Sequence, residues 1–165
     1  ELYYGAYFSP QLYLTETLTL GGSISFKKYR EWLLWDGDAS QLVGYQTDKY
    51  VGSIRLDWYP SNRQEVRLKF QWIGLDAEVI NSSQLNNSGD LMMSDIASSN
   101  FSVSDTAFQI RYRYQLAPLS DIFFVYSRGG FYGTEDGDEG PKTLFDEGWR
   151  GVQVESIIAK IRYRF

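Results

Sequence analysis

The chain has 165 residues and a formal net charge of −5, and it contains neither cysteine nor histidine. The absence of cysteine excludes disulfides, thiolate metal sites and cysteine nucleophiles, and the absence of histidine removes the commonest general base. Aromatic residues make up 17% of the chain, yet the mean hydropathy is −0.36. No run of about 18 apolar residues occurs, so the sequence predicts no transmembrane helix. We expect residues 1–165 to form one domain or part of one.

Alternation of apolar and polar residues predicts seven β-strands, because successive side chains of a strand point to opposite faces. The first strand is expected at residues 1–14 and the second, unusually long, at 17–35. The third is expected at 50–59 and the fourth at 65–77, where the alternation slips and predicts a β-bulge near Gly74,.

The last three strands are expected at residues 105–116, 121–134 and 152–165. The final one has two distinct faces. Its apolar face carries Ile157, Ala159, Ile161, Tyr163 and Phe165, and its polar face carries Lys160, Arg162 and Arg164. A strand with lipid on one side and a water-filled lumen on the other needs this pattern and no covering layer.

The connections between these strands alternate in length. The short ones are residues 15–16, 60–64 and 117–120, and the long ones are 36–49, 78–102 and 135–151. Outer-membrane barrels have short periplasmic turns and long extracellular loops, with the C-terminus in the periplasm. The pattern therefore predicts an all-β, antiparallel transmembrane β-barrel.

Seven strands are an odd number, whereas single-chain bacterial barrels have even numbers. An unpaired edge strand cannot face lipid, because its backbone polar groups would lack partners. We therefore expect the chain to be the C-terminal part of a larger barrel. No signal peptide is visible, and the chain starts inside a predicted strand, as a mature form or a fragment would.

The end of the chain resembles the C-terminal signature of bacterial outer-membrane barrels, an aromatic residue preceded by apolar or aromatic residues at alternate positions. Here the matching positions are Ile161, Tyr163 and Phe165. The resemblance implies recognition by the barrel-assembly machinery.

Three segments also resemble a bacterial outer-membrane family that joins an N-terminal carbohydrate-binding-module-9-like domain to a large barrel domain of unknown function. They are SIRLDWYPSNRQEVRLKFQW (53–72), FQIRYRYQLAPLSDIFFVYSRG (108–129) and the closing IIAKIRYRF. The turn at 116–120 is the most specific piece. The sandwich domain is absent from this sequence, so no sugar-binding or catalytic residue is carried over.

Cations gather on the predicted lumenal faces. They are Lys27, Arg55, Arg67, Lys69, Arg111, Arg113, Lys160, Arg162 and Arg164. One interpretation is a basic lumen that selects or guides anions. The other is structural: closely packed cations repel, so they pair with carboxylates such as Asp57 or with groups on other strands.

Anions gather in the predicted outer loops, at Asp36, Asp38, Asp146, Glu147 and in the run EDGDEG. Glu135, Asp136, Asp138 and Glu139 have the oxygen-rich spacing that Ca²⁺ prefers, although the full EF-hand pattern is missing. The alternative is a solvated loop bridged by divalent ions to lipopolysaccharide phosphates.

We expect a non-enzymatic, integral outer-membrane protein that forms part of a channel or a scaffold for a surface or transport assembly. The expected partners are the bilayer, lipopolysaccharide, the barrel-assembly machinery, upstream strands and other outer-membrane subunits; neither a cofactor nor a nucleic-acid partner is expected. Two alternatives stay open. One is a surface binding or adhesion module whose long loops contact a glycan or a protein, and the other is a hydrolase that uses loop carboxylates alone.

Overall fold

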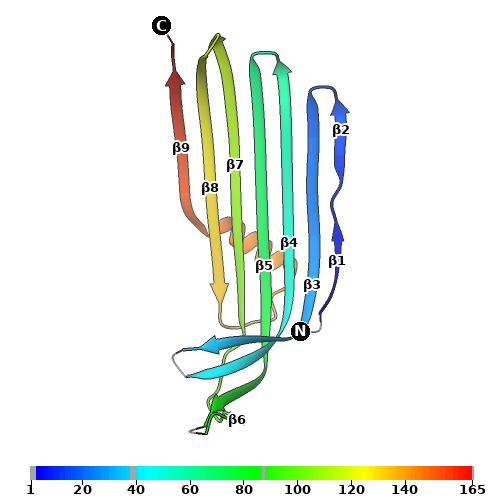
Figure 1. Ribbon diagram of the computed structural model, residues 1–165, viewed down its shortest axis with the longest axis vertical. Coiled ribbons are helices and arrows are strands. Elements are labelled where there is room, and N and C mark those ends of the chain that lie inside the picture. Colours follow the sequence, from blue (N-terminus) through cyan, green and yellow to red (C-terminus); the bar gives the residue numbers. More distant parts are fainter. Residues whose placement is uncertain (1–2, 38–39, 87, 165) are drawn as a thin grey trace.

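The computed structural model describes residues 3–37, 40–86 and 88–164, and it is a single antiparallel sheet with one helix (Figure 1). The strands are β1 (Tyr3–Phe8), β2 (Gln11–Thr15), β3 (Leu18–Asp36), β4 (Gln41–Ser61), β5 (Gln64–Leu85), β6 (Leu91–Met93), β7 (Phe101–Ala117), β8 (Ser120–Thr134) and β9 (Val152–Arg162). The helix, α1, is Pro141–Arg150.

The strands follow the order β1-β3-β4-β5-β7-β8-β9, with β2 also paired to β3 and β6 to β5. Consecutive strands in this order pair with each other, and the described part of the sheet does not close on itself. Its two edges are therefore β1 with β2 on one side and β9 on the other. The prediction of an all-β, antiparallel fold is confirmed.

All seven predicted strands are present, but their limits differ from the prediction. The first is divided into β1 and β2, because Pro10 has no backbone N–H to continue the ladder,. Its carbonyl oxygen still accepts a hydrogen bond from the Gly22 backbone N–H at 3.0 Å, so β2 continues along the same strand, β3.

Two predicted long loops are mostly strand. β3 and β4 remain paired as far as Asp36 and Gln41, and β5 continues to Leu85 before a short hairpin with β6. The predicted bulge at Gly74 is wrong, since Ile73, Gly74 and Leu75 pair in regular register with both neighbouring strands. The register instead shifts beside Ile80. Gly74 serves packing, because a Cβ there would lie 2.8 Å from the Trp72 ring.

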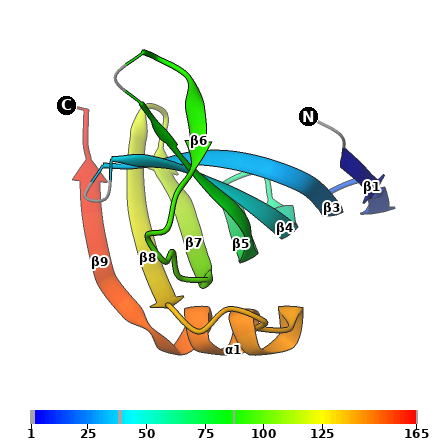
Figure 2. The ribbon, with the colours of Figure 1, turned by 90° about the horizontal axis from the view of Figure 1, so that it is seen from below.

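The acidic segment 135–151, which the sequence predicts as a loop, contains α1. This helix crosses β5, β7 and β8 on one side of the sheet (Figure 2). It begins with Pro141, whose fixed φ suits a first helical turn, and its Leu144 is fully buried,. Short polar helices are unstable alone, so the sheet contacts hold α1 in its helical form.

The two faces of the sheet differ in composition. Cross-strand partners and residues two apart along a strand share a face, so the register assigns each side chain to one side. The face that we call the apolar face carries Leu18, Leu20, Ile24 and Phe26 of β3, Ile54, Leu56 and Trp58 of β4, Val66, Leu68, Phe70 and Trp72 of β5, Phe108 and Ile110 of β7, Phe124 of β8, and Ile157 and Ile161 of β9.

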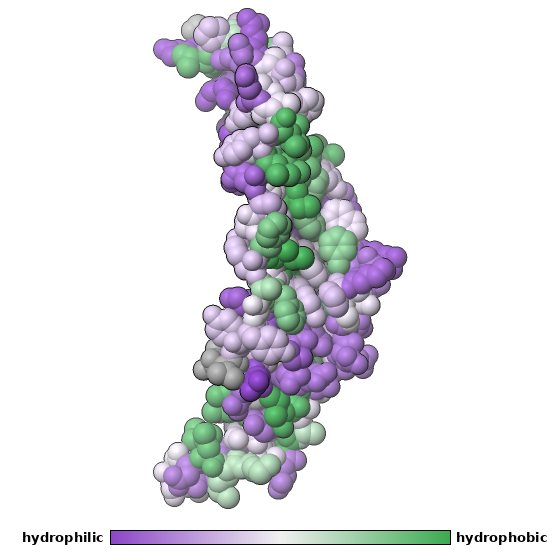
Figure 3. Space-filling view, turned by 90° about the vertical axis from the view of Figure 1, so that its right-hand side faces the viewer, coloured by the Kyte–Doolittle hydropathy of each residue, from purple (hydrophilic) through white to green (hydrophobic). Residues whose placement is uncertain are grey.

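A small hydrophobic core lies at the end of the sheet that carries the long connections. It consists of Val43, Tyr45, Leu75 and Ala77, on the side opposite the apolar face. Segment 98–100 covers it: the Asn100 side-chain oxygen accepts a hydrogen bond from the Val79 N–H at 2.8 Å. Away from this core and from α1, the sheet is a single layer. Figure 3, which views the β1–β2 edge, shows hydrophobic side chains along this edge between hydrophilic ones.

Candidate functional site

Eight of the nine predicted lumenal cations lie on the face opposite the apolar face, which we call the charged face. Arg55 pairs with Lys69, Arg67 with Arg111, and Arg162 with Asp121, and the register places Lys27, Arg113 and Lys160 on the same side. The ninth, Arg164, lies beyond the end of β9.

Three carboxylates tie most of these cations into a ladder of ion pairs that crosses five strands. Asp57 contacts Arg55 at 3.3 Å and Arg67 at 3.4 Å. Glu65 contacts Arg67, Arg111 at 3.4 Å and Arg113 at 3.6 Å. Asp121 contacts Arg113 at 2.9 Å and also Arg162. The structural interpretation of pairing therefore holds for these five arginines.

Glu65 and Asp121 are the buried members of the ladder, with relative exposures of 9% and 0%. A buried carboxylate is tolerated only where cations and donors surround it. Each of the two contacts at least two guanidinium groups. Sequence reasoning named Asp57 but missed Glu65 and Asp121, because their partners lie on neighbouring strands and depend on the register.

The other four cations form no ion pair with any residue that the structure describes: Lys27, Lys69, Lys160 and Arg164. The Lys27 ammonium lies 5.3 Å from the centroid of the Tyr3 ring, as a cation–π contact does,. The Arg164 backbone N–H donates to the Ser120 hydroxyl at 3.1 Å. Within the described ranges, no carboxylate pairs with these cations, so they add positive charge to that of the ladder.

A groove of about 510 Å³ opens on the charged face where β1 gives way to β2. Its residues come from five strands, β1 to β5, and from the break between β1 and β2: Tyr7, Ser9, Pro10, Gln11, Gly21, Gly22, Ser23, Ser53, Ile54, Arg55, Lys69, Phe70 and Gln71. The groove exists because Gly21, Ser23 and Ser53 are small, while Tyr7 and Arg55 beside them are large. Ser23 and Ser53 hydroxyls share a hydrogen bond of 2.7 Å.

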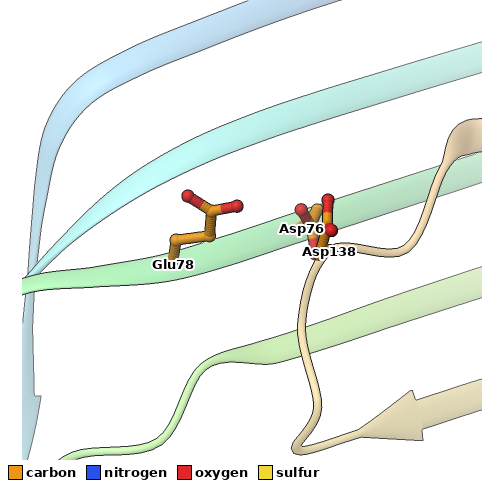
Figure 4. Close-up of side chains that lie close together, drawn as sticks. All are labelled: Asp76, Glu78 and Asp138. Atoms are coloured by element: carbon orange, nitrogen blue, oxygen red, sulfur yellow. The ribbon is translucent and has the colours of Figure 1, made fainter.

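The predicted loop cation site is not assembled from its four residues. Among the described residues, the carboxylates that gather are Asp76, Glu78 and Asp138, whose ligand atoms all lie within 4.8 Å of one another (Figure 4). Asp76 also accepts a hydrogen bond from the Glu139 backbone N–H at 3.3 Å. The sequence did not indicate this cluster, because Asp76 and Glu78 lie in β5, some sixty residues before the loop.

The other loop carboxylates have different neighbours. Asp136 lies 3.4 Å from the Thr134 hydroxyl, and Glu139 accepts a hydrogen bond from the Tyr132 hydroxyl at 3.4 Å.

The predicted barrel-assembly signal lies at the β9 edge of the sheet. Ile161 and Tyr163 are exposed to 69% and 59%. Phe165, the third residue of the signal, and Asp38 of the predicted acidic loops lie outside the described residues.

Comparisons of the chain with protein-family models, with curated proteins and with solved structures found no match. The resemblance to the outer-membrane family with the carbohydrate-binding-module-9-like domain therefore stays a prediction. No helix in the described ranges has the length and apolar character needed to cross a membrane.

Proposed function

We propose that this chain forms part of the wall of a transmembrane β-barrel in the bacterial outer membrane, without enzymatic activity. In this proposal the apolar face meets lipid and the charged face lines a water-filled lumen. The observation that carries it is the separation of side chains between two faces of a single-layered sheet. Large apolar side chains on the apolar face remain exposed, among them Ile24 at 62%, Ile54 at 48% and Ile157 at 79%. Exposed apolar surface of this kind marks contact with lipid or with a partner.

The length of the apolar face supports the same proposal. On β3 it extends from Leu18 to Phe26 and on β4 from Tyr50 to Trp58. A tilted strand crosses the hydrocarbon core in about 9–11 residues. Directly beyond this band, toward the long connections, Lys28 and Asp48 form an ion pair of 3.2 Å on the same face. Charged groups at this level fit a strand that leaves the hydrocarbon.

Helix α1 covers part of the apolar face. This cover is not expected if the whole face is in contact with lipid. It packs where this face becomes polar, between the aromatic residues Phe70 and Phe108 and the hydroxyls of Ser104 and Thr106. In the proposed barrel, α1 covers the outer half of this band on β5 and β7, since Phe70 and Phe108 are in register with Ile54 in the middle of the band. The apolar side chains of β3, β4 and β9 remain uncovered by it.

The two open edges support a larger assembly. Backbone N–H and C=O groups at a sheet edge cannot remain unpaired in lipid. We infer that further strands, upstream in the same protein, pair with β1, β2 and β9 and close the barrel. The expected partners of such a barrel wall are the barrel-assembly machinery and lipopolysaccharide. Its expected role is to form part of a channel or of a scaffold for a surface or transport assembly.

The absence of cysteine allows a direct test with single cysteines at four successive β4 positions: Ser53, Ile54, Arg55 and Leu56. Each is labelled with an environment-sensitive fluorophore in lipid vesicles. We expect nitroxide lipids to quench labels at Ile54 and Leu56, and aqueous iodide to quench those at Ser53 and Arg55. Equal quenching at all four, or the opposite alternation, would contradict the proposal. Single-channel recordings then separate an open channel, which gives conductance steps, from a closed scaffold.

A surface binding module is the second candidate, because apolar side chains are exposed beyond the proposed membrane band. Trp35 at the end of β3 is 56% exposed and Met93 of β6 is 86% exposed. Replacing both by serine would abolish adhesion to a glycan or protein surface while leaving membrane insertion intact. Unchanged adhesion of the double variant would contradict this role.

A further inference from the structure

We propose that the groove on the charged face is a binding site for a small anionic sugar, such as a sugar phosphate or a sugar acid. The proposal rests on the proposed function in one respect: the charged face must be in contact with water.

The lining of the groove is positively charged. Arg55 and Lys69 are directly opposite each other across β4 and β5, and both line the groove. Like charges in this position destabilise a sheet unless a counter-ion offsets them. Asp57 lies 3.3 Å from Arg55, but Lys69 has no ion pair among the described residues. No carboxylate is among the described residues that line the groove, so an anion from solution is the group that this pair lacks.

The volume and the polar lining of the groove suit a sugar ring. About 510 Å³ exceeds what a bare phosphate needs and lies within the usual range for small-molecule sites,. The floor carries the hydroxyls of Ser23 and Ser53, and the Gln71 side chain beside Lys69 has no hydrogen-bond partner in the described part of the chain. Such groups match the hydroxyls of a sugar ring.

One wall of the groove is aromatic. Tyr7, 71% exposed, stands across the small floor from the two cations. An aromatic side chain offers a flat apolar surface with a polar end, suited to the C–H face of a sugar. The groove thus places a surface for a ring opposite two charges for an acidic group.

The test is calorimetric titration of the full chain in non-ionic detergent with glucose 6-phosphate, inorganic phosphate and glucose. We expect glucose 6-phosphate to bind at least tenfold more tightly than either of the others, since each of them lacks half of the recognised chemistry. Equal binding of phosphate and glucose 6-phosphate would refute the sugar assignment. Equal binding of glucose would refute the role of charge, and no binding of the sugar phosphate would refute the site.

The matched variants are Lys69→Gln and Lys160→Gln, which remove equivalent charges of the same face inside and outside the groove. A lost charged hydrogen bond lowers affinity about tenfold or more, so we expect this loss only for Lys69→Gln. Ser53→Cys alkylated after folding with a bulky maleimide should also abolish binding, whatever the effect of mutation on folding. If Lys160→Gln weakened binding as much as Lys69→Gln does, the proposal would be overturned. Because this assay involves no bilayer, its failure is distinguishable from a failed lipid-quenching test.

Discussion

Arg128 of β8 holds Trp149 of α1 in two ways: its guanidinium carbon lies 4.3 Å from the centroid of the indole ring, and its Nη2 donates a 2.7 Å hydrogen bond to the Trp149 carbonyl oxygen. The Trp149 ring in turn packs edge-on against Phe70 and Phe108 of the sheet. One cation therefore satisfies a carbonyl at the C-terminal end of the helix and fixes the aromatic residue that anchors α1.

Replacing Arg128 by glutamine should release the C-terminal half of α1. A cation–π contact and a charged hydrogen bond are lost, which together lower the free energy of unfolding by about 2 kcal/mol. Urea unfolding followed by tryptophan fluorescence measures this loss. Arg150→Gln is the control, since the Arg150 side chain is 73% exposed and pairs with Glu147 at 3.2 Å on the helix surface. If the two variants were equally stable, the contacts of Arg128 would not hold the helix.

Gly148→Ala should destabilise the protein, although alanine is intrinsically the better helix former. A Cβ at position 148 would lie 2.3 Å from the Ser104 hydroxyl oxygen, which accepts a hydrogen bond from the Trp72 ring N–H at 2.9 Å. Ser104 is almost fully buried, so relief requires moving α1, at a cost of about 1–3 kcal/mol,.

Two further variants control this prediction. Gly140→Ser, at the N-cap where nothing lies within 4 Å of an added Cβ, should leave stability unchanged or slightly raised,. Ser104→Gly combined with Gly148→Ala makes room for the methyl group and should recover part of the loss. A single Gly148→Ala variant that is more stable than the native protein would show that α1 does not pack closely on β7.

The strands and their faces could be predicted from the sequence because the period of two is a local property. Val66, Leu68 and Phe70 alternate with Arg67 and Lys69, and this alternation alone assigns the two sides of β5. The ends of the strands were less predictable. β3 and β4 extend into a polar segment whose composition favours a loop, and they do so because the two strands pair with each other there.

Helix α1 and the carboxylate groups could not be predicted in the same way. The segment around Leu144 is rich in glycine and acidic residues, and it becomes a helix through contacts with Gly74 and Ser104, which are distant in sequence. Likewise, Asp138 meets Asp76 only because β8, which precedes the loop, pairs with β7, and β7 pairs with β5. Such contacts follow from the tertiary arrangement, which no local pattern contains.

Glu65→Gln should weaken the ladder of ion pairs. Glu65 contacts Arg67, Arg111 and Arg113, so its neutralisation leaves three cations close together in the middle of the ladder. The arginines are about 40% exposed, and solvent screens part of their repulsion, so we expect a loss of about 1–2 kcal/mol,. Urea titration at low salt measures it, with Glu147→Gln, which removes a single surface pair, as the control. Equal effects of the two substitutions would mean that the ladder does not stabilise the sheet.

Asp138→Asn should stabilise the protein, for two independent reasons. Its carboxylate lies in the cluster with Asp76 and Glu78, so removing its charge relieves repulsion,. Its φ of 62° is left-handed, a conformation in which asparagine is common,. Because Asp138 is exposed, we expect a gain of only about 0.5–1 kcal/mol, measured in a chelator at low ionic strength and shrinking as salt is added. Asp95→Asn makes the same charge change at an exposed position outside the cluster and should leave stability nearly unchanged. An equal gain from both substitutions would trace the effect to net charge, and no gain from Asp138→Asn would show that the three carboxylates do not repel measurably.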